Sequence, residues 1–185
     1  MDQFNEIEPL ARARSLAGPL ANAAYEIERT RRIPEPLLSQ LHEQGLFRLL
    51  LPREVGGGEV APGAYVLALE EIACHEASVA WNIFVGNSAA LIAPYLDVAA
   101  AQEIFADPRT VIAWGPPHKG LADAEAGGYR VSGRWEFASG CRQANWMGVH
   151  CRVKEADGSL RLNQAGHPTL RTLLFPADQA TLHDT

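Results

Sequence analysis

The sequence predicts an α+β protein, with an N-terminal all-helical bundle followed by an antiparallel β domain. Two observations support this fold class. Apolar residues recur every three or four positions in the first half of the chain, and they alternate with polar residues after Pro108. Because a run of helices followed by a run of strands indicates two units, we expect a helical domain over residues 1–108 and a β domain over residues 109–185.

The first helical pattern covers residues 7–27, where apolar side chains line one face. Gly18 and Pro19 interrupt the pattern, and we expect a kink or a break there. A second helix is predicted to begin near Pro36, because proline is favoured in the first turn of a helix. Gly45 is well placed to cap its C-terminal end.

A third helix is predicted over residues 63–74, and a fourth follows at once. Ser78 can cap the fourth helix, VAWNIFVGNSAALIA, which ends before Pro94 and is apolar nearly all round, so we expect it to be buried. Its 15 residues are fewer than the roughly 20 that a membrane-spanning helix needs. Asp97 can cap a short fifth helix, VAAAQEIFA.

The remaining pattern alternates and predicts strands. TVIAW forms a first strand, and residues 129–137 form a second with one apolar face. Ser132 and Gly133 within it indicate either a tight turn or a bulge. Two further strands are predicted over residues 146–153 and 169–175.

Composition excludes several classes of protein. The net charge of -6 and the pI near 5.5 argue against binding to nucleic acid, which requires a clustered basic surface. The N-terminal segment MDQFNEIEPL is acidic and polar, unlike a secretory signal. We therefore expect a protein without a nucleic-acid or membrane partner.

The cysteines and histidines lack the spacing of metal ligands. Cys74, Cys141 and Cys151 form no CxxC pair, and none of the six histidines is paired at a ligand spacing. An odd number of cysteines suits a reducing compartment. We predict a cytoplasmic protein with no bound metal.

Four segments, in this order, carry a resemblance to a known family: RRIPEPLLSQLHEQGLFRLLLPREVGGG, LEEIACHEASVAW, GGYRVSGRWEFASGCRQANW and LLFPADQATLHDT. Together they resemble the N-terminal and middle domains of the acyl-CoA dehydrogenase superfamily. The third segment is the most specific. The dehydrogenases proper usually have Trp-Ile-Thr-Asn where this chain has Phe137, Ala138, Ser139 and Gly140, a form similar to the flavin-dependent monooxygenase (hydroxylase) branch.

The resemblance implies a flavin site in the β domain. Phe137, Ala138 and Ser139 would lie along the isoalloxazine ring, with the Ser139 hydroxyl and the adjacent backbone near N5. Trp114 and Gly115 would lie where the dehydrogenases contact the pyrimidine end of the flavin. An aromatic side chain and a small hydroxyl suit a protein surface that packs against the flat flavin ring and excludes water from it. The cofactor, either FMN or FAD, supplies the electron chemistry.

The resemblance also implies a substrate pocket. In many hydroxylases of the family, a histidine of the fourth helix helps to form the pocket where oxygen reacts. This chain has Asn87 and Ser88 in the corresponding stretch, so these are the candidate substrate-pocket residues. Either can donate a hydrogen bond, but neither is an acid or base near neutral pH. No catalytic residue is assigned.

Members of the family continue beyond the HDT at residues 183–185 with the rest of the β domain and a C-terminal helical bundle, which supplies a catalytic base and most of the tetramer interface. We therefore expect an incomplete middle β domain, no C-terminal bundle, and a homo-oligomer or a complementing C-terminal chain.

The implied function is that of a two-component monooxygenase, which uses reduced flavin and O2 on a small aromatic or heterocyclic substrate. A separate flavin reductase would supply the reduced FMN or FAD. Two alternatives stay open. One is an acyl-CoA dehydrogenase, and the other is a non-catalytic remnant or partner-binding module whose helical face binds another chain.

Overall fold

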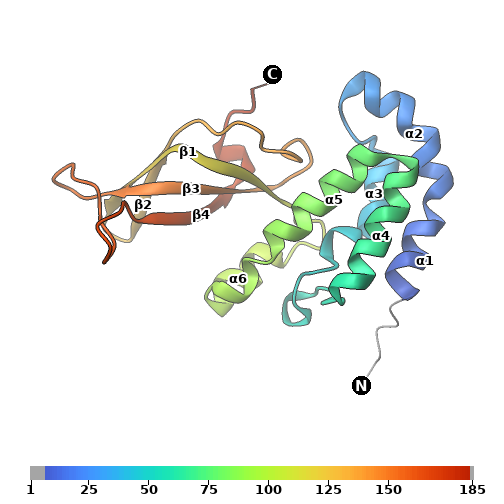
Figure 1. The fold of residues 1–185 in the computed structure, drawn as a ribbon, viewed down its shortest axis with the longest axis horizontal. Helices are drawn as coiled ribbons and strands as arrows, with labels where there is room; N and C mark the ends of the chain where they lie inside the picture. Colours follow the sequence, from blue (N-terminus) through green and yellow to red (C-terminus); the bar gives the residue numbers. More distant parts are fainter. Residues whose placement is uncertain (1–6, 184–185) are drawn as a thin grey trace. The chain divides into compact units, whose positions relative to one another are not determined.

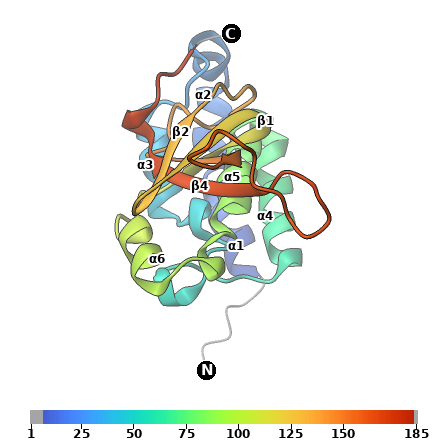
Figure 2. The same cartoon turned by 90° about the vertical axis from the view of Figure 1, so that its left-hand side faces the viewer.

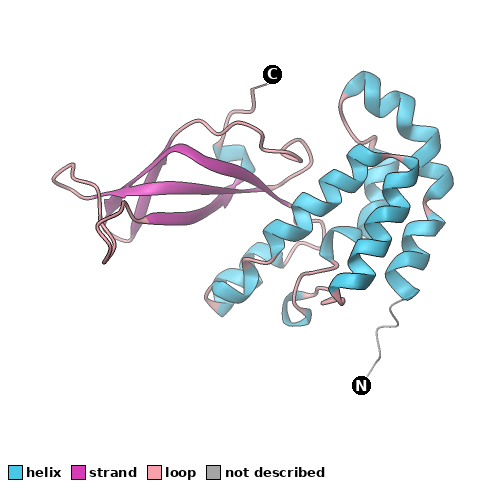
Figure 3. Cartoon of the chain, in the orientation of Figure 1, coloured by secondary structure: helices cyan, strands magenta, loops and turns pink. Residues whose placement is uncertain are grey.

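The computed structural model describes residues 7–183, apart from the side chains of residues 7 and 116–119. The chain divides into two compact units, Met1–Val111 and Ile112–Thr185, of which the first is helical and the second holds a sheet (Figures 1 and 3). The predicted α+β class is confirmed. The division falls slightly after the expected boundary at residue 108. The Thr110 hydroxyl donates to the Ile104 carbonyl at 2.8 Å, which keeps this segment with the helices.

The described part of the helical unit contains α-helices joined by short 3-10 turns. Helix α4 packs against both α1 and α5 (Figures 1 and 2). The helices are α1 (Ile7–Ser15), α2 (Ala17–Thr30), α3 (Glu35–Glu43), α4 (Pro62–His75), α5 (Ala77–Ala90) and α6 (Val98–Phe105), and the turns include Leu46–Arg48, Arg53–Val55 and Ala93–Tyr95.

Two helix boundaries differ from the prediction, each for a local reason. The first helical pattern breaks at Leu16, before Gly18 and Pro19. Both of these residues lie in the first turn of α2, where backbone N–H groups have no intrahelical acceptor, so proline costs no hydrogen bond. Helix α5 is capped by Glu76 rather than Ser78, because the Glu76 carboxylate accepts the Ser78 backbone N–H at 3.0 Å.

The expectation that the fourth helix is buried on all sides is wrong. Val79, Ile83 and Asn87 on one face of α5 are inaccessible. The Trp81 side chain is 56% exposed and Phe84 is 40% exposed. The apolar composition of α5 therefore provides both a core face and an outer aromatic face of the helical unit.

The second unit contains one sheet, in the order β2-β1-β3-β4. Its strands are β1 (Ile112–Glu125), β2 (Gly128–Ser132), β3 (Trp146–Lys154) and β4 (Leu170–Pro176). The pairs β1–β2 and β3–β4 are antiparallel, but β1 and β3 run parallel. The predicted antiparallel domain is therefore wrong at its centre, and the sheet is mixed.

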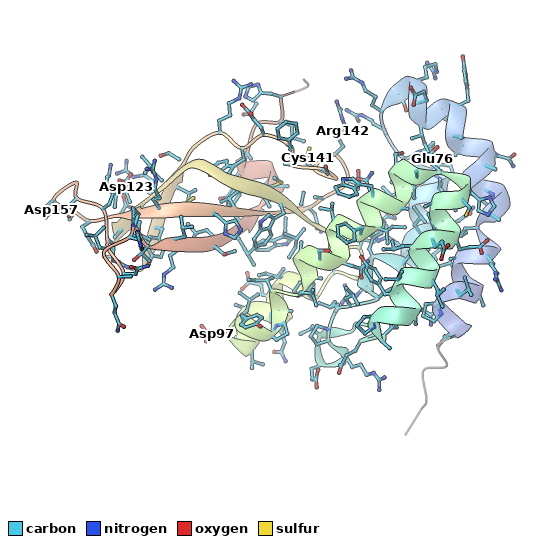
Figure 4. All side chains as sticks on the ribbon, in the orientation of Figure 1. Glu76, Asp97, Asp123, Cys141, Arg142 and Asp157 are labelled. Carbon is cyan, nitrogen blue, oxygen red and sulfur yellow. The ribbon has the colours of Figure 1, made fainter. Side chains whose placement is uncertain are left out.

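The chain path explains the parallel pair. After turning back as β2 on one side of β1, the chain crosses β1 and enters β3 on its other side. Ile112 pairs with Trp146 at one end, and Asp123 pairs with Lys154 at the other. Asp123, labelled in Figure 4, also forms an ion pair with Lys154 at 2.6 Å.

The predicted strand over residues 129–137 is wrong beyond Ser132, since residues 133–145 form the crossing loop. Cys141 and Arg142, labelled in Figure 4, lie on this loop. A Cβ atom at Gly133 would lie 2.9 Å from the Gly120 Cα atom, so the chain passes closely over β1 there. This long-range packing ends the strand, although the local pattern alternates further.

The core of the sheet unit lies on the side that this loop covers. Its buried centre is extended by partly buried apolar side chains from β2, β4 and the loop. The residues are Ala122, Val149 and Cys151, packed by Val131, Trp135, Leu173 and Phe175. Across the described chain, no helix combines the length and the apolar character that crossing a membrane requires.

Candidate functional site

Trp114 and Gly115 are neighbours on β1, and they face opposite sides of the sheet. The half-buried Trp114 ring lies over Gly148 of β3, where an added Cβ atom would be 2.5 Å from the Trp114 Cε3 atom. An added Cβ atom at Gly115 would lie 2.7 Å from the Trp135 Cβ atom. Both aromatic rings therefore approach the backbone closely because each faces a glycine.

Trp114 is held by a hydrogen bond that the sequence did not predict. Its indole Nε1–H donates to His150 Nε2 at 2.9 Å, and the two rings meet edge to face with centroids 4.8 Å apart. His150 Nδ1 is 3.0 Å from the Thr172 hydroxyl. Burial lowers the pKa of His150 below its ordinary value, which favours the neutral imidazole.

Phe137, Ala138 and Ser139 lie in the crossing loop rather than at a strand end. Phe137 has a φ of 57° and is 84% exposed, which is unusual for an aromatic residue. The Ser139 N–H donates to the Phe137 carbonyl at 2.8 Å, and the Cys141 N–H donates to the Ala138 carbonyl at 3.1 Å. Within the described residues, the Ser139 hydroxyl forms no hydrogen bond.

The two sets of predicted cofactor-binding residues come from adjacent segments. Trp135 contacts Gly115 and precedes Phe137 by two residues. Two residues of extended chain span at most about 7 Å, so the Phe137 backbone stays close to β1. The Phe137 backbone thus lies near Gly115 on the face that carries Trp135, whereas the Trp114 ring lies on the opposite face, over Gly148.

Asn87 and Ser88 of α5 belong to the helical unit and face different surroundings. The Asn87 amide is fully buried, and all three of its hydrogen bonds go to the backbone. Its Nδ2 donates to the Leu46 carbonyl at 2.8 Å and to the Ile83 carbonyl at 2.9 Å, while its Oδ1 accepts the Leu50 N–H at 3.0 Å. Asn87 therefore ties α5 to the segment after α3, and its amide has no donor left for a ligand.

Ser88 is exposed, and its hydroxyl donates to the Phe84 carbonyl at 2.8 Å. Trp81, Phe84, Ser88 and Leu91 follow a helical spacing that puts them on one face. The Trp81 and Phe84 rings are 5.4 Å apart, and Leu91 is 48% exposed. Sequence reasoning missed this aromatic face because it treated α5 as buried throughout, although the spacing was visible.

Comparison with known proteins identifies the family. The family described as acyl-CoA dehydrogenase, N-terminal domain, matches residues 11–104, half of the chain. The chain belongs to the acyl-CoA dehydrogenase superfamily. The predicted resemblance is thereby confirmed, including its monooxygenase branch, since relatives with that activity match as well.

Two of these superfamily relatives are oxygenases. Indole-3-acetate monooxygenase of Pseudomonas putida is 30% identical over 163 residues, covering 86% of this chain and 39% of its own. The oxygenase component of the FADH2-dependent resorcinol hydroxylase of Rhizobium sp. is 31% identical over 179 residues, covering 95% and 42%. This chain spans about two fifths of the length of these relatives.

A solved structure of the superfamily agrees with the fold. XiaF from Streptomyces sp., in complex with FADH2 and glycerol, superposes with a TM-score of 0.88 at 25% identity. The match covers 97% of this chain and 44% of that one. The acyl-CoA dehydrogenase-like fold of the described residues is therefore confirmed.

The residues of the sheet unit fit the flavin of this superfamily. The exposed Phe137 ring offers a flat apolar contact, and the unbonded Ser139 hydroxyl can donate or accept. Within the described residues, no group of three or more His, Cys, Asp or Glu side chains is arranged to hold a metal ion.

Proposed function

We propose that this chain carries the flavin-facing part of the oxygenase component of a two-component flavin-dependent monooxygenase. The observation that supports this most directly is Phe137, an aromatic ring 84% exposed on a backbone with positive φ. Holding an apolar ring in water in such a conformation is costly unless a ligand covers it. The oxygenase relatives supply the reaction class.

In this proposal the flavin is FMN or FAD, bound in reduced form, and it supplies the transfer of electrons to O2. Phe137 and Trp114 hold the ring system and exclude water from it. Ala138 is small enough for close approach, and the Ser139 hydroxyl offers a hydrogen bond. Gly115, which is covered by Trp135, contributes by holding the loop on β1. No proton-transfer residue is assigned to the chain.

The substrate is a small aromatic or heterocyclic molecule in this proposal, by analogy with indole-3-acetate and resorcinol in the names of the relatives. Ser88 on α5 is its candidate hydrogen-bond partner, as an acceptor, since the Ser88 O–H already donates to the Phe84 carbonyl. Asn87 contributes indirectly, by fixing α5 against the segment that contains Leu46 and Leu50. The expected partners are a flavin reductase and a second copy or complementing C-terminal chain, in the cytoplasm.

The test is an anaerobic titration of the chain with reduced and oxidised FMN and FAD, followed by tryptophan quenching. Saturable binding that prefers reduced flavin is expected. Phe137→Ala should weaken it about tenfold or more, since stacking on a flat aromatic base is worth about 1–3 kcal/mol. Ser139→Ala should weaken it less. Leu162→Ala, at an exposed site in the β3–β4 connection, is the matched control.

The outcomes separate the candidate functions. A preference for oxidised FAD would favour the acyl-CoA dehydrogenase alternative. Equal flavin affinity of wild type and Phe137→Ala would contradict the proposed contact between Phe137 and the flavin.

The outer face of α5 favours a second candidate function, the binding of another chain. Trp81, Phe84 and Leu91 are exposed there together. Replacing Trp81 and Phe84 with serine should then reduce self-association in sedimentation experiments. A chain that is monomeric before and after the change would argue against this candidate.

A further inference from the structure

The contact between Trp114 and His150 fixes the protonation of the imidazole. An indole nitrogen can only donate a hydrogen bond, so His150 Nε2 must accept at the 2.9 Å separation. A neutral imidazole carries one proton, which must then lie on Nδ1. Nδ1–H donates to the Thr172 hydroxyl at 3.0 Å. Hydrogen bonds thus run in one direction from Trp114 through His150 to Thr172, across β1, β3 and β4.

The strand register builds this arrangement. Trp114 pairs with Gly148, and His150 pairs with Thr172. Gly148 and His150 are two residues apart on β3, so they face the same side of the sheet. Because Gly148 has no side chain, the Trp114 indole can lie across β3 and reach His150.

Packing restricts the indole further. The site of a Gly148 Cβ atom is 2.5 Å and 2.7 Å from the Trp114 Cε3 and Cζ3 atoms, and 3.2 Å from the Leu174 Cδ2 atom. The ring is therefore confined by backbone below and by a hydrogen bond at its edge. These are the features of a side chain whose orientation is set before a ligand arrives.

We infer that His150 is a positioning residue, which orients Trp114 for flavin binding by accepting its indole N–H while Thr172 fixes the imidazole tautomer. The inference rests on the proposed function, because it takes Trp114 as a flavin contact. It adds two residues, His150 and Thr172, that need not touch the flavin. Preorganisation of this kind increases affinity by removing the cost of ordering the ring on binding.

The test uses the 185-residue chain and two readouts. The first is the indole N–H proton resonance of Trp114 without flavin, assigned by its loss in Trp114→Phe. The second is the dissociation constant for reduced FMN and FAD. His150→Leu removes the acceptor, whereas His150→Gln restores an oxygen acceptor and an N–H donor. His167→Leu, at an exposed histidine of the β3–β4 connection, is the control.

The expected result has three parts. His150→Leu moves the Trp114 resonance upfield, speeds its exchange with solvent and weakens reduced-flavin binding about tenfold, the size of one lost hydrogen bond. His150→Gln recovers most of the affinity. Thr172→Val, which removes the acceptor of Nδ1–H, weakens binding less than His150→Leu.

The opposite results are distinct. An unchanged Trp114 resonance in His150→Leu would show that the hydrogen bond is absent and would overturn the inference. A shifted resonance with flavin affinity within twofold of wild type would make His150 structural only, and would overturn it too. If wild type shows the bonded resonance but binds no flavin, the proposed function fails, and the inference fails with it.

Discussion

Gly115 and Trp135 are in contact so close that only glycine fits: a Cβ atom added to Gly115 would lie 2.7 Å from the Trp135 Cβ atom and 2.9 Å from its Cγ atom. This contact holds the crossing loop on β1. Because Phe137 follows Trp135 by two residues, the contact also determines where the exposed Phe137 ring is presented.

Gly115→Ala should therefore destabilise the chain. Overpacking of a filled site typically costs about 1–3 kcal/mol, and we expect a loss of that size in urea-induced unfolding. Gly128→Ala is the control, since nothing lies within 4 Å of a Cβ atom there. It should change stability by no more than about 0.5 kcal/mol. Equal effects of the two changes would contradict the described packing.

Asn87→Ala should also destabilise the chain, by about 2–3 kcal/mol, because it leaves the Leu50 N–H and Leu46 carbonyl without their buried partner. Ser88→Ala is the neighbouring control. Its hydroxyl is exposed, donates to the Phe84 carbonyl and lies beside the Tyr65 hydroxyl, and none of these groups is left buried without a partner, so its loss should cost about 1 kcal/mol or less. Thermal unfolding of both variants measures the difference, and a larger cost for Ser88→Ala would refute the structural role of Asn87.

The free energy of unfolding should fall as the pH drops below about 6.5, the ordinary pKa of histidine. Burial lowers the folded-state pKa of both His42 and His150. At these two positions the unfolded chain therefore binds protons first, and unfolding is increasingly favoured as the pH falls from about 6.5 to the lowered folded-state pKa.

The contribution of His42 can be isolated. Its ring packs on Phe47 with centroids 4.9 Å apart, and its Nδ1 is buried without a partner among the described residues. His42→Leu should flatten the fall in unfolding free energy between pH 6.5 and 5, the range set by the histidine pKa. His167→Leu, at an exposed histidine of the β3–β4 connection, is the comparison variant. An unaltered slope in His42→Leu would show that His42 titrates normally.

The three cysteines should react at different rates with iodoacetamide near pH 7. Cys74 is exposed, Cys141 is half-buried, and burial of Cys151 raises its thiol pKa. We expect the order Cys74, Cys141, Cys151, because accessibility decreases in that order and the raised pKa of Cys151 leaves less of the reactive thiolate. Saturating reduced flavin, under anaerobic conditions, should slow alkylation of Cys141 alone, since Cys141 follows Ser139 by two residues. Mass spectrometry of peptides reads each site, and protection of Cys74 would argue against a site on the loop.

Local pattern predicted the helices well, because amphipathic spacing and proline positions act within one helix. It did not predict the parallel β1–β3 pair, which depends on a crossing over another strand. It also continued the second strand to Phe137, since the contacts that end it, from Gly133 and Trp135 to β1, are long-range.

The candidate site shows the same division. The family motif located the loop that contains Phe137 and Ser139. From the sequence, Asn87 is a polar side chain that could bind a ligand. Its hydrogen-bond partners Leu46 and Leu50 lie about forty positions earlier, so local pattern could not show that its amide is already used. His150 gave no local signal, because its partners Trp114 and Thr172 are on other strands.

The parallel pair also has a consequence for synthesis on the ribosome. The helical unit is compact in itself and ends at Val111, so its folding need not await the sheet. Strand β1 must wait, because Ile112 pairs with Trp146, 34 positions later. At about 5–20 residues per second, one edge of β1 stays uncovered for roughly 2 to 7 seconds. During that interval the nascent chain presents an open strand to chaperones and to neighbouring nascent chains.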